Sequence, residues 1–337
     1  MSKAAELAAL IGSQTALSNR NLIINGAMQV AQRGTSFTST GYTLDRMQML
    51  TANTDNVAFT TTQSSTAPDG FANSLKVDIT TAETALDSDE LFRLLYKIEG
   101  QDLQHLNYGS SAAKSVTLSF YVRSNVTGVY TVEFRLNAAG TSTITKQYTI
   151  SSADTWERKE LTLPANTATA IDNDNSNGLE ISFALAAGSN FTTGALGTSW
   201  ANTATASRYA GQAANVMSST SNEWYITGVQ LEVGEQATPF EHRSFADELA
   251  RCQRYFQKNN VANFTLNVVR QSDNLKRGTL TYPPMRDDPT YTSIDGSGDG
   301  ATINVQDTQP EGLQLRMSGG SDTNVPLVKI YTVEAEL

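Results

Sequence analysis

Residues 115–124 read SVTLSFYVRS, and apolar side chains occupy every second position of this stretch from Val116 to Val122. Successive side chains of a β-strand point to opposite faces of a sheet, so the pattern predicts a strand with one buried face. The same alternation returns after a short turn, from Tyr130 to Leu136. The two segments therefore predict an antiparallel hairpin, and with it a β fold.

Further segments with alternating or continuous apolar residues predict more strands. They lie at 22–30, 46–50, 57–62, 74–79, 91–99, 147–150, 161–163, 179–185 and 224–233. In the last of these, Trp224 and Val229 have opposite parity, so a bulge at Gly228 is expected to restore the inward face. About ten strands separated by turn-rich sequence favour a jelly-roll β-sandwich.

The length of 337 residues exceeds what one hydrophobic core usually organises, which favours more than one domain. We predict an all-β protein, with a short N-terminal helix over 1–20, a jelly-roll β-sandwich over 21–240, a connecting helix over 241–259 and a small C-terminal β domain over 260–337. Ser244 is placed to cap the connecting helix.

The N-terminal segment carries an apolar stripe at helical spacing, which includes Leu7, Leu10 and Ile11. A helix this short needs a partner for its apolar face. We expect these residues to contact another protein or further copies of this chain, and the alternative is packing on the helix's own domain.

Composition narrows the classes of function. The net charge of −10 argues against nucleic acid as a ligand, since neutralising phosphates needs clustered Lys and Arg. One cysteine, Cys252, cannot form an intramolecular disulfide, and no apolar run approaches the roughly 20 residues of a membrane span. Residues 1–20 lack the pattern of a secretory signal, so we expect no membrane insertion and synthesis in the cytoplasm.

Residues for catalysis are few. The chain has two histidines, His105 and His242, and Cys252 falls on the apolar stripe of the connecting helix. His242 is expected to cap the helix or contact a neighbouring domain. Carboxylates are plentiful, and a facing pair could cleave glycans. Those visible, such as Asp87 and Asp89, lie in turn-like sequence, so we expect no enzymatic activity and no catalytic residue.

One polar run is compatible with a structural calcium ion. Asp172, Asp174 and Asn175 stand in a dense series of oxygen donors, and calcium takes several oxygens from a flexible loop. The alternative is an ordinary Asx-rich turn between strands. No other cofactor is expected.

Exposed aromatic rings beside polar side chains are typical of sugar-binding sites. Trp200 and Tyr209 lie in the long polar stretch 186–222, and Trp156 has the opposite parity to Leu161 and Leu163. These three residues are the glycan-binding candidates. For the two loop aromatics the alternative is local packing that holds the loop in place.

Several segments resemble one known family. The segment NLIINGAMQVAQRGTS at 21–36 and the segment GVQLEVGEQATPFEHRSFADELARCQRYFQK at 228–258 are similar to the two ends of a sandwich in phage virion structural proteins of tail-fibre or carbohydrate-binding-module-like type, found in marine podoviruses and prophages. LYKIEG at 95–100 is similar to an internal strand of these proteins. The resemblance covers roughly 21–258 and implies a virion location, a sandwich fold and no catalysis.

With this resemblance, we expect a subunit of a tail fibre or fibre-like appendage that contributes to attachment to glycans on the host surface. The expected partners are other virion proteins, two further copies in a homotrimer and host-surface polysaccharide. Two alternatives stay open, a purely architectural head-decoration or adaptor protein and a glycan-depolymerising tailspike.

Overall fold

The computed structural model describes residues 19–54, 56–137, 141–259, 264–265, 268–272, 275–297, 302–318 and 327–337. The described chain divides into two compact units, one ending at Arg243 and one beginning at Ser244. The predicted N-terminal helix, with Leu7, Leu10 and Ile11, lies outside the described residues. No helix in the described part of the chain is long and apolar enough to span a membrane.

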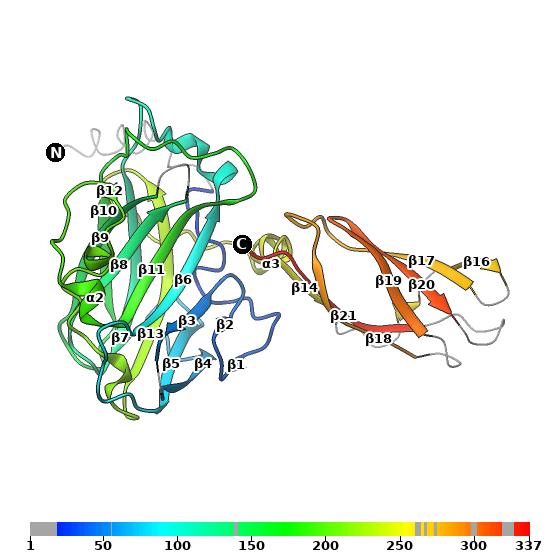
Figure 1. Ribbon diagram of the computed structural model, residues 1–337, viewed down its shortest axis with the longest axis horizontal. Coiled ribbons are helices and arrows are strands. Elements are labelled where there is room, and N and C mark those ends of the chain that lie inside the picture. Colours follow the sequence, from blue (N-terminus) through cyan, green and yellow to red (C-terminus); the bar gives the residue numbers. More distant parts are fainter. Residues whose placement is uncertain are drawn as a thin grey trace. The chain divides into compact units, whose positions relative to one another are not determined.

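The first unit is a sandwich of two antiparallel sheets (Figure 1). Sheet A contains, in spatial order, β1 (Ser36–Phe37), β4 (Ala58–Ser64), β5 (Ser74–Thr81), β13 (Glu223–Val233), β7 (Val116–Ser124) and β10 (Glu157–Leu163). Sheet B contains β12 (Ala201–Asn202), β9 (Ser142–Ile150), β8 (Gly128–Leu136), β11 (Asn177–Ala187), β6 (Leu91–Glu99), β3 (Gln48–Ala52) and β2 (Gly41–Tyr42). The predicted all-β jelly-roll sandwich is confirmed. The predicted hairpin between 116–122 and 130–136 is wrong, because β7 pairs within sheet A and β8 within sheet B.

The core lies between the two sheets. The alternating apolar residues of 115–124 are all buried, and they face the inward residues of β8, β9 and β11. Phe120 on β7 contacts Tyr148 on β9 and Phe183 on β11 edge-on, with ring centroids 5.1 and 5.2 Å apart. Rings from both sheets therefore interdigitate, as in other packed sandwiches.

Short helical segments connect or follow the strands. In the first unit they are η2 (Gly100–Leu106), α2 (Ser189–Thr192), η3 (Thr205–Ser207) and η4 (Val216–Ser218). They lie in the connections, so the strands alone form the two layers.

The expected bulge in β13 is present. The register of β13 against β7 shifts between Thr227 and Gln230, and Gly228 has a φ of +61°. Trp224 on one side and Leu231 on the other are both fully buried. The extra residue restores the inward face, as predicted.

The predicted strand at 22–30 is wrong. Asn25 and Met28 adopt left-handed backbone, with φ of 60° and 56°. The Asn25 side chain accepts a hydrogen bond from the backbone N–H of Val30 at 2.9 Å and donates to the carbonyls of Val30 (2.9 Å) and Asp45 (3.0 Å). A buried asparagine thus satisfies the backbone groups that a neighbouring strand would otherwise pair.

The second unit begins with α3 (Phe245–Gln253), where the Ser244 hydroxyl accepts a hydrogen bond from the Asp247 N–H, as expected of a cap. The helix is shorter than the predicted 241–259 because Phe256 already pairs in a strand. One sheet contains β14 (Phe256–Asn259), β21 (Leu327–Glu334), β15 (Phe264–Thr265) and β18 (Thr290–Ser297), and the other contains β16 (Val268–Ser272), β17 (Leu275–Thr281), β20 (Gly312–Ser318) and β19 (Thr302–Gln309).

Candidate functional site

A long connection covers the outer face of sheet B. Ser182 and Glu133 alternate with core residues and so point outward, yet both are buried. Arg208, in the connection between β12 and β13, donates two hydrogen bonds of 2.8 Å to the Glu133 carboxylate. Burial opposes the charge of Arg208, but these bonds raise its pKa above its ordinary value. This part of sheet B is therefore closed to ligands by the chain itself.

The prediction that Tyr209 offers a ring to a sugar is wrong. Its side chain is fully buried beneath the connection, where the hydroxyl lies 2.8 Å from the Ser182 hydroxyl and accepts from Arg93 at 3.1 Å. The ring contacts Phe191 edge-on. Sequence position in a polar stretch suggested exposure, but the tyrosine attaches that stretch to the sheet.

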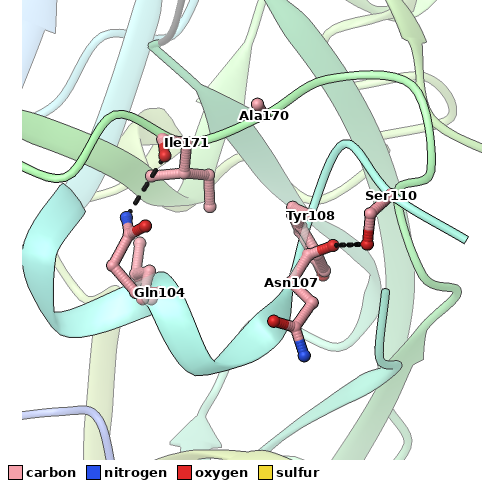
Figure 2. A pocket seen from close by; sticks show the side chains of 7 residues that line it. Gln104, Asn107, Tyr108, Ser110, Ala170 and Ile171 are labelled. Carbon is pink, nitrogen blue, oxygen red and sulfur yellow. Dashed lines mark hydrogen bonds between the residues drawn. The ribbon is translucent and has the colours of Figure 1, made fainter. Parts of the chain in front are cut away.

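Trp200 also has a packing role. Its indole N–H donates to the Pro164 carbonyl at 2.8 Å, and its half-buried ring contacts Tyr108 edge-on at 5.9 Å. Tyr108 in turn lines a small pocket of about 280 Å³, together with Leu103, Gln104, Asn107, Ser110, Ala170 and Ile171. Figure 2 shows Gln104 and Ile171 on one side of this pocket and Tyr108, Asn107 and Ser110 on the other.

The small pocket is a weak candidate for a glycan site. Its single ring, Tyr108, has a buried hydroxyl, and burial raises the pKa of that hydroxyl above its ordinary value. The Gln104 amide donates to the carbonyls of Gly100, Ile171 and Asp172, at 2.9, 3.2 and 3.2 Å. The Gln104 amide thus mainly holds the loop that contains Ile171 and Asp172.

That loop carries the candidate calcium ligands. Asp174 Oδ1 accepts hydrogen bonds from the backbone N–H and the hydroxyl of Ser176, at 3.0 and 2.5 Å, which is the geometry of an Asx turn. Asp172 is exposed and Asn175 is half-buried. Across the described residues, no three His, Cys, Asp or Glu side chains come together as a metal site would require. Calcium binding by Asp172, Asp174 and Asn175 stays a prediction.

A larger pocket lies on the outer face of sheet A. We call it the sheet A pocket; its volume is about 580 Å³, and it is lined by Asp69, Gly70, Phe71, Tyr121, Arg158, Ala237, Thr238, Pro239, Phe240 and His242. Phe71 lies at its centre, with ring centroids 5.4 Å from Tyr121, 5.1 Å from Phe240 and 5.2 Å from His242. Phe71, Tyr121 and Phe240 are half-buried, and His242 is exposed.

Two glycines position the rings of the sheet A pocket. The segment Pro68–Phe71 forms a turn closed by the Phe71 N–H on the Pro68 carbonyl at 3.1 Å, and Gly70 has the positive φ of +88° that a type II turn requires. Beneath it, a Cβ on Gly228 would lie 2.7 Å from Phe71 and 3.0 Å from Tyr121. The bulge glycine therefore leaves the space that the two rings fill.

Polar groups surround these rings. Arg158 stands directly across from Tyr121 in the register of β10 and β7, and its guanidinium donates to the Thr238 carbonyl at 3.0 Å. Asp69 is exposed at the turn before Phe71. Aromatic faces beside hydrogen-bonding groups suit a sugar, because its C–H patches stack on rings while its hydroxyls pair with polar atoms.

Trp156 lies near the start of β10, beyond the lining of the sheet A pocket. Its half-buried ring contacts Tyr225 edge-on at 6.0 Å, and Tyr225 points outward from sheet A between Arg123 and Lys76. The structure thus places Trp156 on the same face of the sandwich as the pocket, while Trp200 and Tyr209 lie elsewhere. It does not bring the three candidates together.

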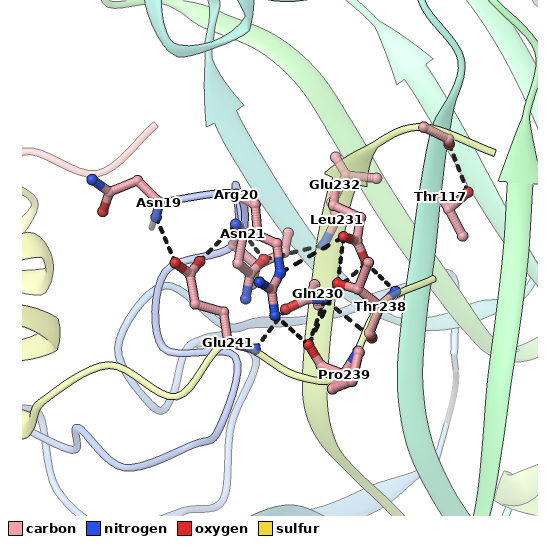
Figure 3. Close-up of polar contacts among 12 residues, drawn as sticks. Asn19, Arg20, Asn21, Thr117, Gln230, Leu231, Glu232, Thr238, Pro239 and Glu241 are labelled. Atoms are coloured by element: carbon pink, nitrogen blue, oxygen red, sulfur yellow. Dashed lines mark hydrogen bonds and ion pairs between the residues drawn. The ribbon is translucent and has the colours of Figure 1, made fainter. Parts of the chain in front are cut away.

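A polar network fixes one wall of the sheet A pocket. Figure 3 shows the Glu232 carboxylate beside Thr238, whose backbone N–H and hydroxyl donate to it at 2.8 and 2.7 Å. Gln230 Nε2 donates to the same carboxylate at 2.8 Å. Nearby, Glu241 accepts hydrogen bonds from the backbone N–H groups of Asn19 and Asn21. Residues 19–21 and residues 230–241, which are far apart in the sequence, thus meet in this network.

Acid should destabilise the contact in which Glu241 accepts hydrogen bonds from Asn19 and Asn21. Burial opposes its ionisation, but the N–H groups of Asn21 and Asn19 and the charges of Arg243 and Arg20 lower its pKa below the usual 4.5. A carboxylate with a lowered folded-state pKa stabilises the fold above about pH 4.5, and this contribution disappears as the pH falls through the folded-state pKa. Between about pH 5 and 3, wild type should lose more unfolding free energy than Glu241→Gln, in urea titrations. Equal losses of unfolding free energy in the two proteins would contradict the stabilising role of the Glu241 carboxylate.

The residues of the sheet A pocket were not among the sequence candidates. Phe71, Tyr121, Phe240 and Arg158 come from four separate segments, and His242 was expected to cap the helix or to contact a neighbouring domain. Two signals point to the pocket in retrospect, the turn sequence before Phe71 and the outward parity of Tyr121. Neither identifies Phe240, which is distant in sequence.

Comparisons with known proteins give the following. No protein-family model and no curated protein matches the chain. The chain is similar over 64% of its length to the enzymatically active domain of tailspike protein 4 from bacteriophage CBA120, with 12% identity and a TM-score of 0.35, and it spans 22% of that structure. It is similar over 66% of its length to the whole of a family 11 carbohydrate-binding module from a Clostridium thermocellum cellulase (11% identity, TM-score 0.30). It is similar over 64% of its length to the whole of TmCBM61, solved with β-1,4-galactotriose (11% identity, TM-score 0.30). Similarities at this level carry no information about ligand or activity, so the function is argued from the sheet A pocket.

Proposed function

We propose that this protein is a non-enzymatic virion protein of a bacteriophage, a subunit of a tail-fibre or similar appendage, which binds glycans on the host surface through the sheet A pocket. The observation that carries the proposal is the cluster of partly exposed rings, Phe71, Tyr121, Phe240 and His242, beside Arg158 and Asp69. The resemblance of 21–36 and 228–258 to phage virion proteins supports the location.

The mechanism is recognition without bond breaking. A sugar ring would lie against Phe71 and Tyr121, and its hydroxyls would donate to Asp69 and to backbone carbonyls of the Thr238 segment. A shallow site of this kind binds one sugar chain weakly. Three copies in a homotrimer, and many trimers on a particle, would multiply weak contacts into firm attachment.

Removing one ring should abolish most of the binding. Tyr121→Ala is expected to cost about 2 kcal/mol of binding free energy, or roughly 30-fold in Kd, because the ring is a central anchor of the pocket. The measurement is isothermal titration calorimetry of the full chain with soluble β-glucan, β-1,4-galactan and galactomannan. Gly228→Ala should also weaken binding, because its Cβ would displace Phe71.

The matched control is Tyr291→Ala. This variant removes a tyrosine of the second unit, whose side chain is 48% exposed. It should leave binding unchanged. Equal affinities of wild type and Tyr121→Ala would contradict the proposed site. Mass spectrometry of purified particles tests the virion location, and absence of this chain from them would contradict it.

A further inference from the structure

Positive charges on the outer face of sheet A are already paired. Lys76 Nζ lies 2.6 Å from Glu223 and 3.4 Å from Asp78, and the Arg123 guanidinium lies 2.9 Å from Asp154. Although burial opposes it, hydrogen bonds from Lys76 and Tyr225 lower the pKa of Glu223, so this carboxylate stays charged. The surface around Tyr225 therefore offers no cation in excess to an approaching anion.

The positive charge of the sheet A pocket is also paired with a carboxylate. Arg158 is the one lining residue, among those the structure describes, with a permanent positive charge. Its guanidinium is paired with Glu160 and donates to the Thr238 carbonyl at 3.0 Å. The rim carries Asp69, which is exposed and makes no ion pair or hydrogen bond within the described part of the chain.

From this distribution we infer that the sheet A pocket selects neutral glycans over acidic ones, an inference that rests on the proposed glycan binding. A uronate carboxylate in the pocket would meet the negative charges of Asp69 and Glu160. At Arg158 it would compete with Glu160 for the guanidinium, and a displaced Glu160 would be left without its cation. Hydroxyl groups of a neutral sugar meet no such conflict, because they donate to carboxylates and accept from a guanidinium.

The test compares each neutral polysaccharide with the same polymer oxidised at C6 to the uronate. Titration calorimetry of the full chain with β-glucan, β-1,4-galactan and galactomannan, before and after oxidation, should show at least one neutral polymer binding and its oxidised form binding about tenfold more weakly. The difference should shrink in about 0.5 M salt, because salt screens charges beyond a few ångströms.

Glu160→Gln tests the cause. This variant leaves Arg158 without a carboxylate partner, so binding of the oxidised polymer should tighten about tenfold while binding of the neutral polymer stays the same. Glu160 is 47% exposed, and exposed ion pairs contribute little to folding, so the variant should remain folded. Glu180→Gln, the same change on sheet B where Glu180 pairs with Arg135 at 3.1 Å, is the control and should change neither affinity.

The outcomes separate the two proposals. If an oxidised polymer binds wild type as tightly as its neutral parent, or if Glu160→Gln changes both affinities alike, the charge selectivity is wrong and glycan binding stands. If no polymer binds in either form, the sheet A pocket is not a glycan site and both proposals are wrong.

Discussion

Replacing Phe120 with alanine is expected to lower the unfolding free energy of the sandwich by about 3–5 kcal/mol. Phe120 is fully buried on β7 and packs edge-on against Tyr148 and Phe183, which belong to the opposite sheet. Truncation removes the buried apolar area, leaves a cavity between the sheets and ends two aromatic contacts. Phe120→Ala therefore removes a contact between the two sheets.

Urea unfolding followed by tryptophan fluorescence measures this change, because Trp224 is fully buried in the same core. The matched control is Phe120→Leu, which keeps most of the volume and should cost roughly 1–1.5 kcal/mol. Equal stabilities of Phe120→Ala and Phe120→Leu would mean that the ring does not fill the space between the sheets.

Glu232→Gln should be nearly as damaging, with a loss of about 2–4 kcal/mol. The carboxylate is only 1% exposed and accepts hydrogen bonds from Thr238 and Gln230. A glutamine of the same shape turns one acceptor oxygen into an N–H₂ donor, which then faces another donor. The penalty arises because a buried polar group loses its partner.

The same variant should weaken glycan binding, because Thr238, Pro239 and Phe240 form a wall of the sheet A pocket. Urea unfolding and titration calorimetry on one preparation measure both effects. Glu235→Gln changes an exposed carboxylate in the same segment and should leave stability and affinity unaltered. If Glu232→Gln unfolds like wild type, the carboxylate does not hold this segment in place.

The strands were predictable because their signal is local. Alternation within 115–124 requires only that neighbouring side chains point to opposite faces, and the bulge at Gly228 followed from a change of parity within one strand. The strand prediction for 22–30 was wrong because the side chain of Asn25 makes the hydrogen bonds that a neighbouring strand would make. The apolar content of the segment does not reveal this role of Asn25.

The pocket was harder to predict because it depends on register. Tyr121 and Arg158 become neighbours only through the pairing of β7 with β10, and Phe71 and Phe240 reach them from distant turns. Aromatic residues in polar stretches were a misleading signal for a related reason. Tyr209 attaches the long connection to sheet B, and a sequence does not show which surface a loop covers.

The sandwich starts and finishes at one place. Leu22 donates its backbone N–H to the Leu231 carbonyl at 2.9 Å, and Glu241 accepts hydrogen bonds from Asn19 and Asn21. The first and last segments of the sandwich therefore lie side by side. A module with adjacent ends can be spliced into an unrelated polypeptide without stretching either neighbour. Recombination can thus move the sandwich from one polypeptide to another while the parts that flank it stay as they are.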